Sequence, residues 1–239
     1  MKTRLSVNIN KVALLRNSRL GNYPDLFQFA KDCEHFGAQG ITIHPRPDQR
    51  HIRYSDVPIL KALVTTELNI EGNPTPDFIN LVLDTLPAQC TLVPDAENVL
   101  TSDSGWDTIR NKYLLRDTVD RLHNAGIRVS LFVDPIPEMV NGAKETGADC
   151  VEFYTGDYAK LFSIDREKAV APHIEAALIA NDVELMINAG HDLNLKNLAY
   201  YKSAIPNLAE VSIGHAIVAD ALYYGIENVI QMYLHQLKT

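Results

Sequence analysis

The sequence predicts a single-domain α/β protein, a (β/α)8 TIM barrel with a polar lumen and extra short helices, and three observations support this fold class. The chain has 239 residues, 46 % of them apolar, and no stretch between residues 1 and 239 is typical of a linker. Short β-rich runs alternate with longer amphipathic stretches along the whole chain. Eight such pairs match a closed barrel, whereas a doubly wound sheet usually has about five to seven strands.

The expected elements follow one another in strict alternation. Strands are expected at Leu5–Asn8, Gly40–His44, Glu67–Glu71, Gln89–Val93, Arg128–Val133, Cys150–Tyr154, Val183–Asn188 and Ala209–Ile213. Helices are expected at Pro24–Phe36, Asp56–Thr65, Pro76–Leu86, Lys112–Ala125, Pro137–Thr146, Asp165–Asn181, Asn194–Ala204 and His215–Leu237.

Residues at the expected helix ends support these limits. Thr75 and Ser55 each precede a helix and are predicted N-caps, because their hydroxyl groups can accept from free helical N–H groups. Glycines close three helices just before a strand, at Gly37, Gly126 and Gly147. These repeated helix–glycine–strand junctions indicate a repeated βα unit.

Strand alternation predicts the polar lumen. In a parallel barrel both faces of a strand are usually apolar, but if Leu5 and Val7 face the helices, then Ser6 and Asn8 face the barrel axis. The same alternation places further polar residues inward, namely Thr42, His44, Asn69, Glu71, Glu152, Asn188, Glu210 and Ser212. Buried carboxyl and imidazole groups cost free energy unless they are paired or hydrated, so the pattern favours catalysis over polar core residues without function.

The composition limits the partners and the location. A net charge of −8 argues against nucleic acid or an anionic membrane as a partner, and no apolar run approaches the roughly 18 residues that span a bilayer. We expect a soluble, cytoplasmic protein with three reduced, packed cysteines. Residues 1–53 nevertheless hold nine Lys and Arg against four acids. This surplus indicates either a small anionic ligand or a solvated basic face.

A cluster of reactive side chains begins where the second strand ends. His44 can exchange a proton near neutral pH, and Arg46 offers a planar fork of donors suited to a phosphate. Metal-dependent barrel hydrolases often place two histidines one residue apart on a strand, but Arg46 occupies the second position here, so no metal is expected. Glu71 ends the third strand, where it is either a general base or a salt-bridged structural residue.

Two later segments are typical of a phosphate site. Asn188-Ala189-Gly190-His191-Asp192 follows the seventh strand, and Gly214-His215 leads from the eighth strand into the last helix. Barrels often bind phosphate with these two loops and a helix N-terminus, and a glycine permits close approach. The long segment Asp95–Asn111, which contains Thr101, is a candidate lid or substrate loop.

Over nearly its full length the chain resembles the pyridoxine 5′-phosphate synthase family. The resemblance rests on ordered segments: Val7-Asn8-Ile9-Asn10, Leu15-Arg16-Asn17-Ser18-Arg19, Gly40-Ile41-Thr42-Ile43-His44 with Arg46, Arg50-His51-Ile52, Asn69-Ile70-Glu71, Leu92-Val93-Pro94, Val129-Ser130-Leu131-Phe132, Glu152 with Thr155-Gly156, Asn188-Ala189-Gly190-His191 and Ile213-Gly214-His215-Ala216-Ile217.

The resemblance implies a ring closure without a cofactor. 1-Deoxy-D-xylulose 5-phosphate and 3-amino-2-oxopropyl phosphate would combine to give pyridoxine 5′-phosphate, phosphate and water. It implies proton acceptors at His44 and Glu71, a proton donor at His191, and Glu152 as a stabiliser of charged intermediates. It also implies a homo-octamer, and two groups of phosphate contacts: Asn8, Arg19, Gly214 and His215 for the aminoketone, and Asn10, Lys11, Arg46, His51 and Thr101 for the sugar.

Three positions depart from the family pattern. Asn10-Lys11 stands where many members have Asp-His, and Asp192 stands where a glycine is common. Lys11 could contact phosphate in place of an imidazole. Asp192 could bind substrate only through its backbone N–H, with its carboxylate turned away from the phosphate.

Two other functions are compatible with the sequence. An aldolase-type barrel would form a Schiff base through Lys11, which borohydride trapping with substrate would reveal. A barrel that binds or senses a sugar phosphate without catalysis would bind both substrates but release no phosphate.

Overall fold

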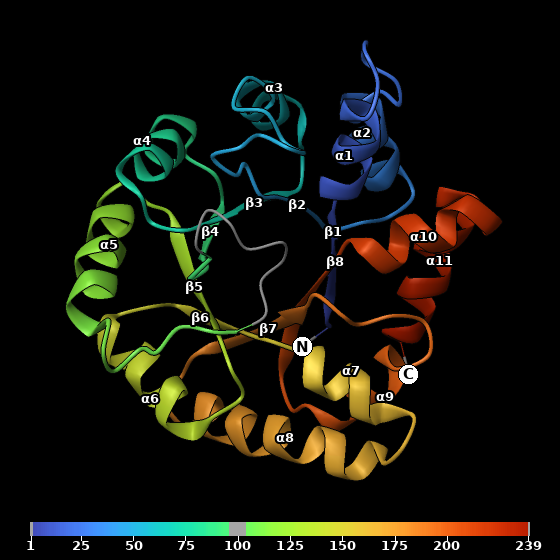
Figure 1. Ribbon diagram of the computed structural model, residues 1–239. Coiled ribbons are helices and arrows are strands. Elements are labelled where there is room, and N and C mark those ends of the chain that lie inside the picture. The colour runs from blue at the N-terminus through green and yellow to red at the C-terminus, as the bar shows by residue number, and fades with distance from the viewer. Residues whose placement is uncertain (1, 96–103, 239) are drawn as a thin grey trace.

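The computed structural model describes residues 2–95 and 104–238, and in these ranges eight parallel strands form a closed barrel in sequential order (Figure 1). The barrel closes because the first strand pairs with the second and the eighth, with Val7 opposite both Ile41 and Ile213. The helices form a ring around the strands (Figure 1). The predicted single-domain TIM barrel is confirmed. No helix within the two described ranges has both the length and the apolar character of a membrane span.

The elements have the following bounds. The strands are β1 Arg4–Asn8, β2 Gly40–Ile43, β3 Glu67–Gly72, β4 Gln89–Leu92, β5 Arg128–Val133, β6 Cys150–Phe153, β7 Met186–Gly190 and β8 Leu208–Ile213. The helices are α1 Asn10–Asn17, α2 Leu26–His35, α3 Asp56–Leu63, α4 Pro76–Thr85, α5 Lys112–Asn124, α6 Pro137–Thr146, α7 Gly156–Phe162, α8 Arg166–Asp182, α9 Leu198–Ala204, α10 His215–Tyr224 and α11 Ile226–Gln236.

The helix and strand limits differ from the predictions in several places. The short helices α1 and α7 lie outside every predicted helical range. The single predicted helix His215–Leu237 is two helices, α10 and α11, because Gly225 between them has a φ of +75° and a ψ of 147°, which interrupt the helix. β7 begins at Met186 instead of Val183, because Glu184 has a φ of +57° and makes a turn before the strand.

The predicted caps are confirmed except one. The Thr75 hydroxyl accepts from Phe78 N–H at 3.3 Å, and Gly37, Gly126 and Gly147 all have positive φ. Ser55 is not the predicted side-chain cap, because its backbone is already helical and its side chain makes no capping hydrogen bond.

Several polar residues of the lumen are buried and hydrogen-bonded to one another. Ser6 Oγ lies 2.8 Å from Thr42 Oγ1, which accepts from Asn69 Nδ2 at 3.4 Å. Thr91 Oγ1 donates to Asn69 Oδ1 at 3.0 Å. This chain of contacts crosses β1, β2, β3 and β4, so the predicted inward face is confirmed for these residues. The apolar side chains between them, such as Val7 and Ile41, are fully buried against the helices.

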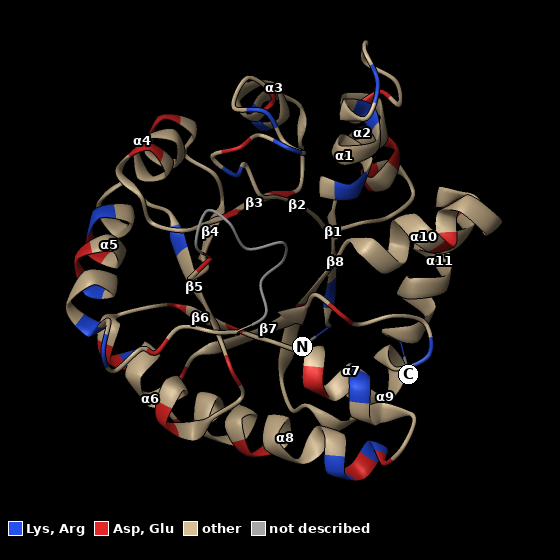
Figure 2. Cartoon of the chain, in the orientation of Figure 1, with Lys and Arg blue, Asp and Glu red and all other residues tan. Residues whose placement is uncertain are grey.

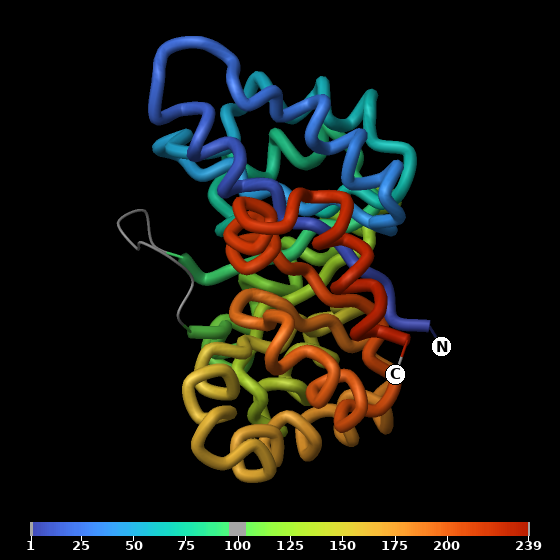
Figure 3. Tube along the Cα trace, turned by 90° about the vertical axis from the view of Figure 1, so that its right-hand side faces the viewer, coloured from blue at the N-terminus to red at the C-terminus, as the bar shows by residue number. Residues whose placement is uncertain are grey.

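Ion pairs gather at the amino ends of the strands. Arg4 Nη1 lies 2.6 Å from Glu67 Oε1, and Arg4 Nη2 lies 3.2 Å from Glu210 Oε2. Arg128 pairs with the other oxygen of Glu67. Figure 3 shows both chain ends on this side of the barrel. The polar cavity described below lies on the opposite side of the barrel, where the strands end.

A buried ion pair attaches α1 to the segment after β2. The Arg16 guanidinium, 1 % exposed, donates to both carboxylate oxygens of Asp56 at 3.0 and 2.8 Å. It also donates to the carbonyl oxygen of His51 at 3.2 Å. Arg16 therefore fixes the position of the His51 backbone through this hydrogen bond.

We predict that Arg16→Met lowers the free energy of unfolding by about 3 kcal/mol, because Asp56 would remain buried without its cation. Urea unfolding followed by circular dichroism measures the change. Arg110→Met is the matched control, because Arg110 pairs with Asp107 at the surface and its loss should cost less than about 1 kcal/mol. Equal losses in both variants would contradict the prediction.

Candidate active site

A cavity of about 660 Å³ opens at the carboxyl ends of the strands. This is the end at which barrel enzymes carry their reactive groups. Twelve of the fourteen predicted site residues line it: Asn8, Asn10, Lys11, His44, Arg46, His51, Glu71, Glu152, His191, Asp192, Gly214 and His215. Arg19 is exposed between α1 and α2 and does not line the cavity. Thr101 lies outside the described residues.

Hydrogen bonds connect His44 to the start of α1 and to the segment that follows β2. His44 N–H donates to Asn10 Oδ1 at 2.9 Å, and His51 Nδ1 donates to the His44 carbonyl oxygen at 3.1 Å. Burial, followed by the positive charges of His51, Arg46 and Arg50, lowers the pKa of His44 to about 3. His44 is therefore a neutral imidazole at neutral pH and can accept a proton.

Positive charge gathers on one side of the cavity. Figure 2 shows Lys and Arg at the start of α1 and in the segment that follows β2. Lys11, Arg46 and Arg50 come from these segments and line the cavity. Arg46 is 3 % exposed and its Nη1 lies 3.1 Å from Asp95 Oδ2. This side has the charge and the planar donors that suit a phosphate group.

Carboxyl groups occupy the floor of the cavity. Glu71 on β3 accepts from Asn8 Nδ2 at 3.3 Å. Burial raises the pKa of Glu71 well above its ordinary value, and the negative charges of Glu152, Asp95 and Glu210 raise it further. Burial and the Glu210 charge raise the pKa of Glu152 to about 7, against the opposing effect of His191. A carboxyl group with the pKa of Glu152 can carry and release a proton near neutral pH.

His191 follows β7 and has the opposite electrostatic setting from His44. Its Nδ1 lies 2.7 Å from Asp192 Oδ2. Burial lowers the pKa of His191, but the hydrogen bond and charge of Asp192, with the charges of Glu152 and Asp95, raise it above the ordinary value overall. His191 therefore retains its proton to higher pH than a free histidine and is suited to donating one.

Asp192 has partners other than those expected for a phosphate contact. Its N–H donates to Thr155 Oγ1 at 3.2 Å, and its carboxylate faces His191. The backbone N–H that was expected to remain for a phosphate is therefore engaged within the protein. A direct contact of Asp192 with substrate stays a prediction.

The start of α10 packs closely against β1. A Cβ at Gly214 would lie 2.9 Å from the Asn8 carbonyl oxygen, so a larger residue would force β1 and β8 apart. Gly214, His215 and Ala216 face the cavity where α10 begins. A helix N-terminus presents N–H groups and a partial positive charge, which suit an anion.

Sequence reasoning missed Asp95 as a site residue. Asp95 follows the segment Leu92-Val93-Pro94, lines the cavity and pairs with Arg46. The available signal was a carboxylate just after a strand end, but strand alternation could not show that its partner lay two strands away. Asn194 also lines the cavity and was predicted as the start of a helix, which begins four residues later at Leu198.

The pKa of Glu152 leads to a prediction about stability. A carboxyl group whose folded pKa of about 7 exceeds its ordinary 4.5 contributes stability that is present below about 4.5 and is lost as the pH rises through about 7. The glutamine of Glu152→Gln cannot ionise. From about pH 5 to about pH 8 the free energy of unfolding should therefore fall by about 2 kcal/mol less in this variant than in wild type. Urea unfolding at both pH values tests this. Glu175→Gln, an exposed change on α8, is the control, and parallel pH profiles for wild type and Glu152→Gln would contradict the prediction.

Comparison with known proteins agrees with this geometry. Residues 5–239 match the family model described as pyridoxal phosphate biosynthesis protein PdxJ. The chain is 60 % identical over 236 residues to pyridoxine 5′-phosphate synthase of Cytophaga hutchinsonii, covering 99 % of each chain. It is 55 % identical over 236 residues to pyridoxine 5′-phosphate synthase of Flavobacterium johnsoniae, covering 99 % of this chain and 100 % of the relative.

Solved structures with low sequence identity share the fold alone. A 3-keto-L-gulonate-6-phosphate decarboxylase from Vibrio cholerae superposes with a TM-score of 0.68 at 8 % identity, covering 100 % of this chain and 98 % of the other. A phosphoribosylanthranilate isomerase from Thermotoga maritima has a TM-score of 0.61 at 12 % identity, covering 99 % and 98 %. The two full-length relatives and the family model carry the stronger conclusion: the chain belongs to the pyridoxine 5′-phosphate synthase (PdxJ) family.

Proposed function

We propose that this protein is a pyridoxine 5′-phosphate synthase that condenses 3-amino-2-oxopropyl phosphate with 1-deoxy-D-xylulose 5-phosphate. The observation that carries the proposal is the pairing of opposite groups in one cavity. The pKa of His44 is lowered by burial and by nearby cations, whereas the pKa of His191 is raised by the carboxylates beside it. A ring closure that alternately removes and adds protons needs both kinds of group.

Two sides of the cavity suit two phosphate groups. Arg46, Lys11 and His51, with Asn10, lie on the cationic side and would hold the phosphate of the sugar. Gly214, His215 and Asn8 lie where β8 meets α10 and would hold the phosphate of the aminoketone through backbone N–H groups. The family resemblance also assigns Arg19 and Thr101 to these contacts, but Arg19 does not line the cavity and Thr101 lies outside the described residues.

The proton transfers are those that the family resemblance implies, and the opposite pKa shifts of His44 and His191 support them. The amine of one substrate attacks the ketone of the other, and loss of water gives an imine. His44 and Glu71 would remove protons as carbon atoms of the new ring lose hydrogen, and His191 would protonate the oxygen that leaves as water or phosphate. Glu152, a buried residue that lines the cavity, would balance the positive charge of nitrogen-containing intermediates through its carboxylate form.

Lys11 lies at the edge of the cavity and is exposed. A lysine that forms a Schiff base is usually desolvated or close to another cation, which lowers the pKa of its amine. Its exposure favours a role in phosphate binding. Borohydride reduction in the presence of substrate should leave Lys11 unmodified, and an adduct there would overturn the noncovalent reaction.

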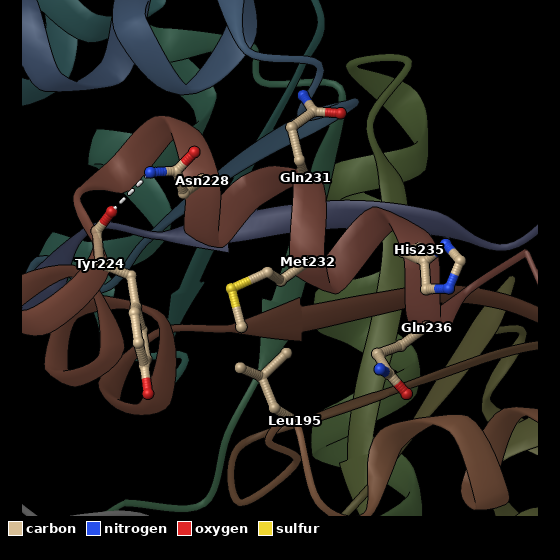
Figure 4. A pocket seen from close by; sticks show the side chains of 7 residues that line it. All are labelled: Leu195, Tyr224, Asn228, Gln231, Met232, His235 and Gln236. Atoms are coloured by element: carbon tan, nitrogen blue, oxygen red, sulfur yellow. Dashed lines mark hydrogen bonds between the residues drawn. The ribbon is translucent and has the colours of Figure 1, made fainter.

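The oligomeric state and the cytoplasmic location stay predictions. The outer face of α10 exposes Leu222, Tyr223 and Tyr224, which is typical of a protein interface. Beside it, a surface cavity of about 600 Å³ lies between α11 and Leu195, with Met232 close to Leu195 in Figure 4. These features support an interface between copies of the chain, as in the homo-octamer that the family resemblance implies.

We predict that His44→Ala, Glu71→Gln and His191→Ala each lower turnover by about 100-fold or more, because each removes a proton-transfer group. Formation of pyridoxine 5′-phosphate from the two substrates, followed by absorbance, measures turnover. His35→Ala is the matched control, because His35 is an exposed histidine on α2. Wild-type turnover in all three site variants would refute the assigned roles, and a wild-type protein that binds both substrates without releasing phosphate would refute the enzymatic proposal.

A further inference from the structure

The imidazole of His191 is held by the carboxylate of the next residue. Nδ1 of His191 lies 2.7 Å from Oδ2 of Asp192. An ionised carboxylate only accepts hydrogen bonds, so Nδ1 carries a proton and donates it to this contact. Nε2 is then the ring nitrogen that exchanges a proton with a substrate.

The backbone of Asp192 is anchored on both sides of its Cα. Its N–H donates to the hydroxyl of buried Thr155 at 3.2 Å. Its carbonyl oxygen accepts from Asn194 Nδ2 at 3.2 Å and from Asn197 Nδ2 at 3.3 Å. The carboxylate of Asp192 therefore projects from a peptide whose position is fixed by three side chains.

The backbone of His191 is held in an uncommon conformation. Its φ is +26°, in a region that residues with a Cβ seldom adopt, so the surrounding contacts must maintain it. Thr155 Oγ1 donates to the Gly190 carbonyl oxygen at 2.7 Å, while Asp192 N–H donates to the same hydroxyl. A Cβ at Gly190 would lie 1.9 Å from the Ser212 carbonyl oxygen, so β7 lies directly against β8 here. Thr155 thus clamps the residues on both sides of His191.

The groups around His191 are mainly acidic. Glu152 comes from β6 and Asp95 from the segment after β4, and both favour the protonated imidazole. Tyr154 packs its ring at 6.1 Å from the imidazole. Lys160 on α7 is a cation that pairs with Asp157 and also interacts with Asp192. Asp192 is the acid that makes a direct hydrogen bond to the ring, and it raises the pKa of His191 more than the other acids do.

We propose that Asp192 is a positioning residue, whose carboxylate orients the His191 ring and keeps it cationic so that Nε2–H can protonate the leaving oxygen. The inference rests on the proposed role of His191 as the proton donor. In the step itself, Nε2 gives its proton to the leaving hydroxyl or phosphate oxygen, and the imidazole becomes neutral. The Nδ1–H of His191 stays hydrogen-bonded to Asp192, so the ring keeps its orientation when Nε2 takes up a new proton.

The test is Asp192→Asn in the full chain, with two measurements. NMR titration of the His191 ring in the ligand-free protein, assigned with His191→Ala, reports the pKa without any need for catalysis. The pH profile of kcat reports the same group during turnover. We expect the His191 titration midpoint to fall and the alkaline limb of kcat to move to lower pH with it. The loss of kcat should be about tenfold near about pH 8 and smaller near about pH 6, with KM little changed.

Two further variants separate positioning from a general loss of charge. Asp192→Glu keeps the carboxylate and should keep the midpoint closer to that of wild type. Asp157→Asn removes one exposed acid from the nearby helix α7, where it pairs with Lys160, and should leave both the midpoint and the kcat profile unchanged.

An unchanged His191 midpoint in Asp192→Asn would overturn the inference. A lower midpoint with an unmoved alkaline limb of kcat would also overturn it, because the ring would then be held by Asp192 without being the donor. Failure of the proposed function has a different result: wild type forms no product, or His191→Ala turns over at the wild-type rate. The NMR titration still decides in that case whether Asp192 holds His191.

Discussion

The burial of carboxyl groups inside the barrel is the constraint on which the rest of the structure depends. Glu71, Glu152 and Glu210 extend from β3, β6 and β8, and burial is the largest effect that raises the pKa of each. A barrel filled with aliphatic side chains would give such groups no partners. The amide of Asn8 instead supplies a partner for Glu71, and the guanidinium of Arg4 supplies one for Glu210.

The same constraint separates the two histidines of the cavity. His44 lies among the cations that follow β2, and its pKa falls. His191 lies among acids, and its pKa rises despite its burial. The pKa values of two imidazoles in one cavity are thus shifted in opposite directions, and the difference arises from neighbours that come from different strands. Environment, and not residue type, assigns the acid and the base.

Much of the fold could be predicted from the sequence because alternation within strands is a local property. Ser6 and Thr42 alternate with fully buried apolar residues, and this alone places them on the axis. Arg46 and His44 were found for a similar reason, since they follow a strand end directly. Local pattern also explains the errors. The break at Gly225 lies inside a continuous apolar periodicity, and a glycine within a helical pattern does not reveal its φ.

Contacts between distant segments could not be predicted in this way. Asp95 becomes a site residue because Arg46, 49 positions earlier, reaches it across the cavity. The sequence predicts that Asp192 lies beside a phosphate, whereas in the structure its carboxylate faces His191. In both cases the residue type was visible in the sequence, but the partner depended on side-chain direction at a strand end.

The ion pairs of Arg4, Glu67 and Arg128 have a consequence for how such a protein can change over generations. They lie at the amino ends of the strands, whereas the reactive groups lie at the carboxyl ends. Substitutions in this charged group change the scaffold, and through Glu210 they also change the electrostatic setting of Glu152 in the cavity. A lineage that alters the ion pairs at one end of the barrel therefore also retunes proton affinity at the other.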